Sequence, residues 1–218
     1  MIKILSQHDL SFLPEQFEAM VLEVKKIQSI CEKIGSGSTP TGGKRIYFSS
    51  GISLIRSTNV FDYNFSFENL AFIDNNQADK LKNVEVKEND ILFNITGVSV
   101  ARCCMVPKNV LPARVNQHVM ILRLVKEMAC SFYMLLNLCS TDSKNALLGI
   151  SQSGSTREAI TKFEIEEFKI IVPNRVLLLE FEAIMKKKFI FKDLQSKENQ
   201  KLSELKDLLL SKLTTIKG

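Results

Sequence analysis

The sequence has no long apolar run and no apolar leader. Its apolar runs are short, as at residues 170–172 and 176–179, whereas a helix that crosses a bilayer needs about 20 consecutive apolar residues. The first ten residues include Lys3 and Asp9, where a signal peptide requires an apolar stretch. We therefore expect a cytoplasmic protein without membrane contact.

Cysteine and histidine are too few, and wrongly spaced, for a typical metal site or disulfide framework. The cysteines are odd in number, form no Cys-x-x-Cys pair and are accompanied by only two histidines. We expect no metal ion, and we interpret the thiols as reduced groups that pack as small apolar side chains. They are Cys31, Cys103, Cys104, Cys130 and Cys139.

No complete catalytic motif is present. The Gly-rich segment 35–45 lacks the Gly-x-x-x-x-Gly-Lys-Ser/Thr spacing of a phosphate-binding loop, and we interpret it as a polar loop with two cations at its end. The Pro-Pro pair of DNA amino-methyltransferases is missing. Glu85 and Lys87 match only half of a metal-dependent nuclease motif, and His118 has no nucleophile context, which favours a structural or hydrogen-bonding role. We expect no catalytic residue and no cofactor.

Composition favours a globular protein with two regions. The chain has 218 residues, 45% of them apolar, and a formal net charge of +5, which permits but does not require a nucleic-acid partner. Residues 1–175 contain all seven arginines and many short β-type runs between turn residues, which predicts a mixed, β-rich α+β domain. Residues 176–218 lack proline and internal glycine, which predicts one long helix.

The predicted helix has a seven-residue apolar rhythm. Alternating steps of four and three from Leu177 to Ile216 meet apolar residues at eight of twelve positions, although Lys188, Gln195 and Glu198 interrupt the middle. Forty helical residues extend about 60 Å, so part of this seam needs a partner helix, unless the helix folds back on its own domain. We predict a coiled-coil spacer with dimer contacts at Phe181, Ile184, Phe191, Leu202, Leu205 and Leu209.

The β-rich region also carries side chains suited to DNA. Arginine pairs with phosphate or with guanine, asparagine and glutamine match adenine, and hydroxyl groups bind phosphate oxygens. Any one of them is also an ordinary surface group. We predict DNA contacts at Lys44, Arg45, Arg56, Asn94, Thr96, Arg102, Gln117, Ser153, Thr156 and Arg157.

Short motifs follow one another along the chain before the long helix. They are Gly35-Ser36-Gly37-Ser38-Thr39-Pro40, then Tyr47 with Gly51-Ile52-Ser53-Leu54-Ile55-Arg56-Ser57, then Asp90-Ile91-Leu92-Phe93 with Gly97, then Asn116-Gln117-His118, then Ser153-Gly154-Ser155-Thr156 and Ile170-Ile171-Val172-Pro173. In this order, over about residues 22–218, the chain resembles the specificity subunit of type I restriction-modification enzymes.

The resemblance implies a non-enzymatic DNA-recognition subunit. In that family a target recognition domain binds one half of a split site in double-stranded DNA, and a long helix packs antiparallel against a second one. The usual subunit carries two of each, and this chain carries one of each. The resemblance therefore implies either a homodimer that reads a palindromic bipartite site or a fragment of a longer chain.

The implied partners are methyltransferase subunits, which bind S-adenosylmethionine, and in the complete enzyme a restriction subunit. Two alternatives stay open. The first is a coiled-coil interaction or scaffold protein that does not bind DNA, and the second is an enzyme built around Glu85 and Lys87 or around a divergent phosphate loop. Salt-dependent DNA affinity distinguishes the first alternative, and catalytic turnover by the isolated chain would reveal the second.

Overall fold

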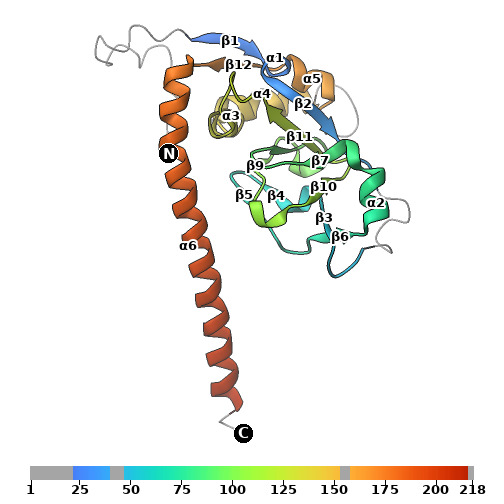
Figure 1. Ribbon diagram of the computed structural model, residues 1–218, viewed down its shortest axis with the longest axis vertical. Coiled ribbons are helices and arrows are strands. Elements are labelled where there is room, and N and C mark those ends of the chain that lie inside the picture. The colour runs from blue at the N-terminus through green and yellow to red at the C-terminus, as the bar shows by residue number, and fades with distance from the viewer. Residues whose placement is uncertain (1–21, 40–46, 153–157, 216–218) are drawn as a thin grey trace. The chain divides into compact units, whose positions relative to one another are not determined.

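The computed structural model describes residues 22–39, 47–152 and 158–215. The chain divides into two compact units, residues 1–178 and 179–218, which are considered separately. Figure 1 shows the strands of the first unit and the long helix α6. No helix of the described residues is long and apolar enough to cross a membrane.

The first unit contains two four-stranded sheets. The first has the order β6 (Ala71–Ile73), β3 (Ile52–Ile55), β10 (Ala113–Val115) and β7 (Glu85–Val86), with β3 and β10 parallel and the other pairs antiparallel. The second is wholly antiparallel, with the order β2 (Cys31–Ser36), β11 (Val119–Leu124), β8 (Ile91–Asn94) and β9 (Cys103–Met105). The mixed, β-rich α+β prediction is confirmed.

The two sheets enclose the main core. Leu54 and Val115 of the first sheet and Leu92 and Ile121 of the second belong to one cluster of buried side chains, and each of the four is fully buried. Burial of each side chain of this size stabilises the fold by about 1.5–3 kcal/mol. The first unit is therefore stabilised by packing between its own sheets.

Short helices and ribbons surround the sheets. The helices are α1 (Ile27–Ile30), α2 (Asn75–Lys80), α3 (Ser131–Leu138), α4 (Thr141–Gln152) and α5 (Lys162–Glu167), with 3-10 turns at Ser57–Asn59, Lys82–Val84, Gly97–Ser99 and Lys108–Val110. Helix α3 packs beside β9 and buries Met134, Leu135 and Leu138 completely. Two-stranded ribbons pair β1 (Glu23–Lys26) with β12 (Lys169–Val172) and β4 (Val60–Phe61) with β5 (Asn64–Phe65).

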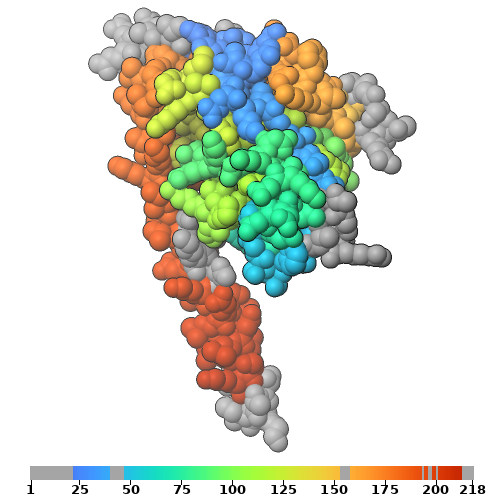
Figure 2. Space-filling model, turned by 45° about the vertical axis from the view of Figure 1, so that its right-hand side comes forward, coloured from blue at the N-terminus to red at the C-terminus, as the bar shows by residue number. Residues whose placement is uncertain are grey.

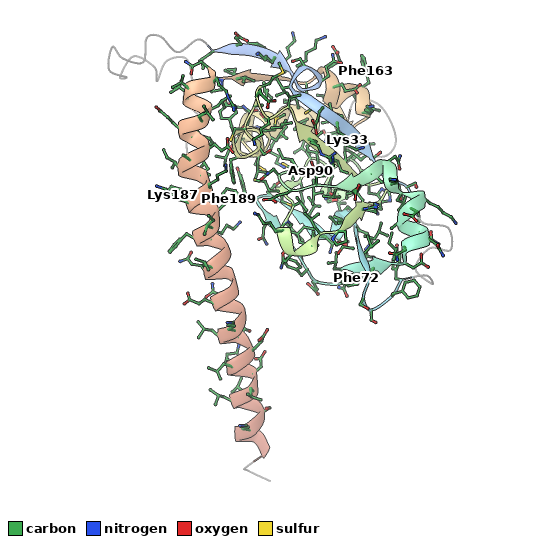
Figure 3. All side chains as sticks on the ribbon, viewed as in Figure 1. Lys33, Phe72, Asp90, Phe163, Lys187 and Phe189 are labelled. Carbon is green, nitrogen blue, oxygen red and sulfur yellow. The ribbon has the colours of Figure 1, made fainter. Side chains whose placement is uncertain are left out.

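The first and last segments of this unit lie side by side, as the blue and orange surfaces of Figure 2 show. The Ile27 N–H donates to the Phe168 carbonyl at 2.9 Å, and the Gln28 amide donates to the Glu167 carboxylate at 2.7 Å. Phe163 of α5 remains exposed at this surface (Figure 3). The pairing closes the β-rich unit shortly before the long helix begins.

Two of the seven arginines, Arg123 and Arg114, make their contacts within the fold. Arg123 donates from Nε and Nη2 to the two oxygens of the fully buried Asp90 at 2.7 and 2.8 Å, and these bonds are the main cause of the raised pKa of Arg123. Asp90, labelled in Figure 3, also accepts the Lys87 N–H at 2.7 Å. Arg114 is buried and donates to the Ala78 carbonyl at 3.1 Å. Both guanidinium groups are therefore held by hydrogen bonds inside the unit.

Helix α6 spans Arg175–Thr215 and contains 41 residues. It follows Pro173, and the side chain of Asn174 accepts the Leu177 N–H at 3.0 Å, which satisfies one of the unpaired donors of the first turn. No glycine or proline interrupts the helix. The predicted long C-terminal helix is confirmed.

Candidate nucleic-acid interface

Four segments leave the two sheets at one edge of the first unit. They are residues 37–39, 56–59, 95–102 and 116–118, which we call the polar edge. The strand register brings them together, because parallel β3 and β10 end side by side, and the end of β8 lies opposite the start of β11. Every described residue among the predicted DNA contacts lies on the polar edge or next to it.

Gly37 allows two of these segments to touch. Its N–H donates to the Asn116 carbonyl at 3.1 Å, and a Cβ added at this position would lie 1.7 Å from the Val115 carbonyl oxygen. Only glycine fits such a close backbone approach. Glycines 35 and 37 therefore differ in role, since Gly35 lies within β2 opposite Ile121 and a Cβ there would meet nothing within 4 Å. The polar loop expected from residue 35 is wrong in its first two residues.

The structure corrects the prediction for Asn94. Its side chain is fully buried, and Nδ2 donates to the carbonyls of Ser57 and Val60 at 3.0 and 3.4 Å. Its Oδ1 has no hydrogen-bond partner among the described residues. Because the amide lies beneath the surface, Asn94 links the β8 end to the 56–59 turn and does not present itself to a base.

A chain of polar side chains lies at the surface of the same edge. Thr39 donates from its hydroxyl to Gln117 Oε1, Gln117 Nε2 lies 3.0 Å from His118 Nε2, and His118 Nδ1 lies 2.7 Å from Thr96 Oγ1. Gln117 is exposed, and Thr96 is half-buried. These contacts confirm the hydrogen-bonding role predicted for His118. They place donors and acceptors from three segments in one row, which suits base edges or phosphate oxygens.

Two arginines are fixed by aromatic rings beside this row. The guanidinium of Arg56 lies 5.5 Å from the ring centre of Tyr47, and that of Arg102 lies 5.3 Å from that of Phe61. Arg56 also donates to the Asn69 carbonyl, and its buried Nε has no hydrogen-bond partner among the described residues. Both arginines are half-buried, so their charges are held in place while part of each side chain stays accessible.

The remaining predicted contacts, Lys44, Arg45, Ser153, Thr156 and Arg157, lie outside the described residues. The described residues that flank these positions in the sequence lie at the polar edge or contact it. Thr39 precedes the first of these segments, and Glu158 follows the second and accepts the Gly97 N–H at 2.8 Å. We keep these five positions as predictions.

The sequence patterns predicted no contact role for Tyr47, Phe61, Thr39 or Val98, although Tyr47 and Thr39 belong to the motifs given above. The first two orient arginines, Thr39 extends the polar row, and Val98 is 95% exposed in the Gly97–Ser99 turn. The available sequence signal for Val98 was the neighbouring Gly97, because glycine favours turns. In the structure Gly97 has a φ of 68° and lies in the turn. Pairing of an arginine with a distant ring leaves no trace in sequence spacing.

The half nuclease motif is used structurally. Glu85 lies in β7, where its carboxylate is 3.6 Å from Arg114 and its carbonyl accepts from Arg123 at 2.9 Å. The Lys87 N–H is occupied by Asp90, as described above. These contacts give Glu85 a structural role, whereas the contact of Lys87 uses only its backbone N–H.

Helix α6 carries the other predicted contact set. Ile184, Phe191, Leu202, Leu205 and Leu209 are exposed, and Phe181 is half-buried. Further large apolar residues of the helix, including Ile190, Leu194 and Leu208, are also exposed. Runs of exposed apolar side chains of this extent are characteristic of association surfaces.

Comparison with known proteins places this arrangement in context. Residues 21–176 match the family described as "Type I restriction modification DNA specificity domain", which covers well over half of the chain. No curated protein matches the chain.

Three similar solved structures share the fold at 14% sequence identity. The S subunit of a type I restriction-modification system from M. genitalium aligns with a TM-score of 0.54 over 80% of this chain and 40% of its own. The HsdS subunit from Thermoanaerobacter tengcongensis aligns with a TM-score of 0.52 over 81% and 45%. A chain from work on the assembly and conformational transition of the type I R-M system gives 0.53 over 81% and 45%. This chain thus spans less than half the length of each.

Proposed function

The chain belongs to the family of type I restriction-modification DNA specificity domains, and from this premise we propose that its polar edge binds one half of a bipartite double-stranded DNA site. The domain then directs methyltransferase subunits, which carry S-adenosylmethionine, and in a complete enzyme a restriction subunit, to that site. The chain itself performs no catalysis and works in the cytoplasm, where these partners meet DNA.

One observation carries the proposal. Three segments bring Thr39, Thr96 and Gln117 into one hydrogen-bonded row at the polar edge, and Arg56 and Arg102 stand beside it on aromatic rings. Phosphate contacts position a protein on DNA, whereas amide and guanidinium groups distinguish bases. The edge offers both kinds of group on a rigid support, as a recognition surface requires.

We extend the proposal to the long helix. An antiparallel pairing of two α6 helices through Phe191, Leu202, Leu205 and Leu209 would cover their exposed apolar side chains. Two-fold symmetry of such a homodimer then predicts a palindromic bipartite site, because each copy reads the same half-site.

The test uses the chain together with its cognate methyltransferase subunits. Sequencing that detects methylated bases identifies the modified motif, and fluorescence anisotropy then compares that duplex with one in which a half-site is scrambled. We expect tighter binding to the intact motif and a linear fall of log K with log salt.

The outcome separates the proposal from its main alternative. A scaffold protein would assemble with partners through α6 but would give no motif and no salt-dependent affinity for DNA. A motif with two unrelated halves would retain DNA recognition and refute the homodimer.

A further inference from the structure

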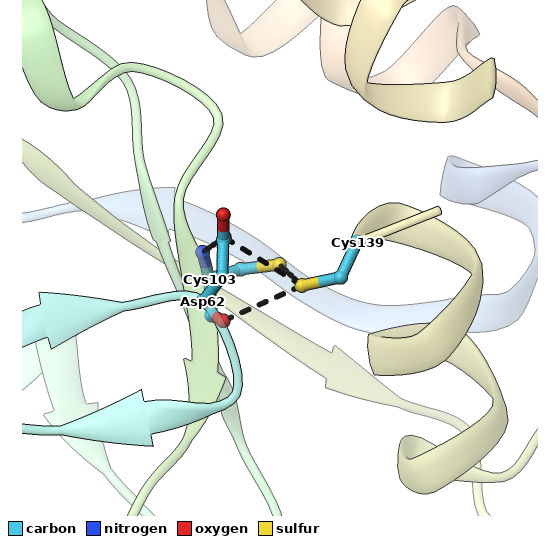
Figure 4. A group of neighbouring side chains, drawn as sticks. All are labelled: Asp62, Cys103 and Cys139. Atoms are coloured by element: carbon cyan, nitrogen blue, oxygen red, sulfur yellow. Dashed lines mark hydrogen bonds between the residues drawn. The ribbon is translucent and has the colours of Figure 1, made fainter. Parts of the chain in front are cut away.

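Three possible metal ligands from three separate elements meet next to the polar edge, as Figure 4 shows. Asp62 lies in the turn between β4 and β5, Cys103 begins β9, and Cys139 follows α3. The two sulfur atoms are 3.3 Å apart, and Cys139 Sγ lies 3.6 Å from Asp62 Oδ1. The candidate ligand atoms all lie within 4.8 Å of one another.

Two of these separations, sulfur to sulfur and Cys139 sulfur to Asp62 oxygen, can be compared with those of a tetrahedral thiolate site. With zinc–sulfur bonds of about 2.3 Å and a zinc–oxygen bond of about 2.0 Å, ideal angles place the two sulfurs about 3.8 Å apart and each sulfur about 3.5 Å from the oxygen. The Cys139–Asp62 distance already agrees. The two sulfur atoms must move apart by roughly half an ångström to reach the ideal separation. Cys139 can make this movement, because it is half-buried and lies at the end of α3.

The charges around the cluster stay balanced when a divalent ion replaces two thiol protons. Lys144 Nζ lies 2.6 Å from Asp62 Oδ1 and also donates to the Ala101 carbonyl, so one positive charge already balances the carboxylate. Cys103 is fully buried. A thiolate there needs a compensating cation. When one divalent cation replaces the two thiol protons, the charges of Lys144, Asp62, the two thiolates and the ion sum to zero.

We propose that Asp62, Cys103 and Cys139 form a binding site for a thiophilic divalent cation, for which zinc is the natural example. Two sulfurs and one carboxylate select zinc or cadmium over magnesium or calcium, which prefer oxygen ligands. The ion would join the β4–β5 turn, β9 and the end of α3. It would also hold Phe61 and Arg102, the sequence neighbours of two ligands, in the contact that orients the arginine. Binding of the ion itself can be measured without DNA, whether or not the proposed DNA function holds.

Cadmium is the probe for the test, because cadmium–thiolate bonds give an ultraviolet charge-transfer band. The full chain, reduced and freed of metal with a chelator, is titrated with cadmium chloride, and zinc affinity follows from competition. We expect the band to saturate at one equivalent, with a rise in melting temperature that excess chelator reverses.

Single variants assign the ligands. C139S and C103S should each lose most of the band, whereas C31S, which removes a thiol of β2, should keep it. D62N should keep both sulfur bonds but bind cadmium at least about tenfold more weakly, since one of three ligands loses its charge. Because Cys103 is fully buried, circular dichroism checks its fold, and the half-buried C139S variant decides the question if C103S fails.

Two results would overturn the proposal. The first is a folded wild-type chain without a cadmium band, or with a band that survives in C139S. The second is a Cys103–Cys139 disulfide found by mass spectrometry after mild peroxide treatment of a chain that binds no cadmium. In that reaction two thiols and one peroxide give a disulfide and two waters, and the pair would then be a redox centre.

Discussion

The β-rich unit buries its large apolar side chains, whereas the long helix exposes many of its own. In the sheets, Leu54 and Ile121 are fully buried, and so is the charged Asp90, which pairs with the half-buried Arg123. In α6, Phe191 and Leu205 are each more than half exposed. The sheets are therefore stabilised by contacts within the unit, whereas the helix exposes apolar side chains that the proposed partner helix would cover.

The largest effect is expected from breaking the interior of the sheets. Asp90→Ala removes both carboxylate oxygens from Arg123 and the acceptor for the Lys87 N–H, and leaves the half-buried guanidinium with only the more distant Glu32 carboxylate at 3.8 Å. We expect a loss of about 3–5 kcal/mol in the free energy of unfolding, measured by urea denaturation.

The control for Asp90→Ala is Glu88→Ala. Glu88 pairs with Lys108 at 2.6 Å, but both side chains are at least half exposed, so its loss should cost about 0–1 kcal/mol. Equal stability of the two variants would mean that the inner ion pair does not support the sheets.

A substitution in the apolar seam of α6 should change the association of chains but not the stability of the β-rich unit. Leu205→Asp places a charge in the apolar seam, and we expect the mass from light scattering to fall to the 24.7 kDa of one chain while the melting temperature of the β-rich unit stays constant. Ser203→Asp adds the same charge on the opposite side of the helix and should leave the mass unchanged. An unaltered mass in Leu205→Asp would refute the coiled-coil assignment.

The joint between the two sheets should show a smaller effect. Gly37→Ala drives a methyl group against the Val115 carbonyl, so we expect a loss of about 1–3 kcal/mol in unfolding free energy as the backbone shifts. Gly35→Ala, two residues earlier in open space, is the matched control and should be close to neutral. Similar denaturation midpoints for both variants would show that the close approach at Gly37 can relax without cost.

Sequence patterns predicted the architecture better than the site. Short β-type runs and an uninterrupted helical tail led to the α+β fold and to α6, because both depend on local periodicity. Gly35 and Ser36 were wrongly expected in a loop, since their weak strand preference is outweighed by pairing with β11. Local composition does not reveal a distant strand.

Side-chain roles were harder to predict, because the residue type does not show whether a side chain points into the core or toward solvent. Asn94 and Gln117 both offer an amide, yet the first is fully buried and the second is exposed. Cys103 and Cys139 are 36 residues apart, so the contact between them depends on the packing of α3 on β9. Such contacts follow from tertiary structure and have no spacing signature.

The exposed amide of Gln117 gives the most specific effect, since its loss should alter DNA recognition but not stability. Gln117→Ala should leave stability unchanged and lower affinity for the methylated motif by about 1–3 kcal/mol, with less discrimination against altered bases and the same salt slope. Gln28→Ala removes an equally exposed amide from α1, away from the polar edge, and should change neither property. Anisotropy on matched and single-base-altered duplexes makes the comparison. Because an amide carries no charge, a changed salt slope for Gln117→Ala would instead indicate that the residue positions the cations of the edge, and undiminished discrimination would remove Gln117 from the set of base-reading side chains.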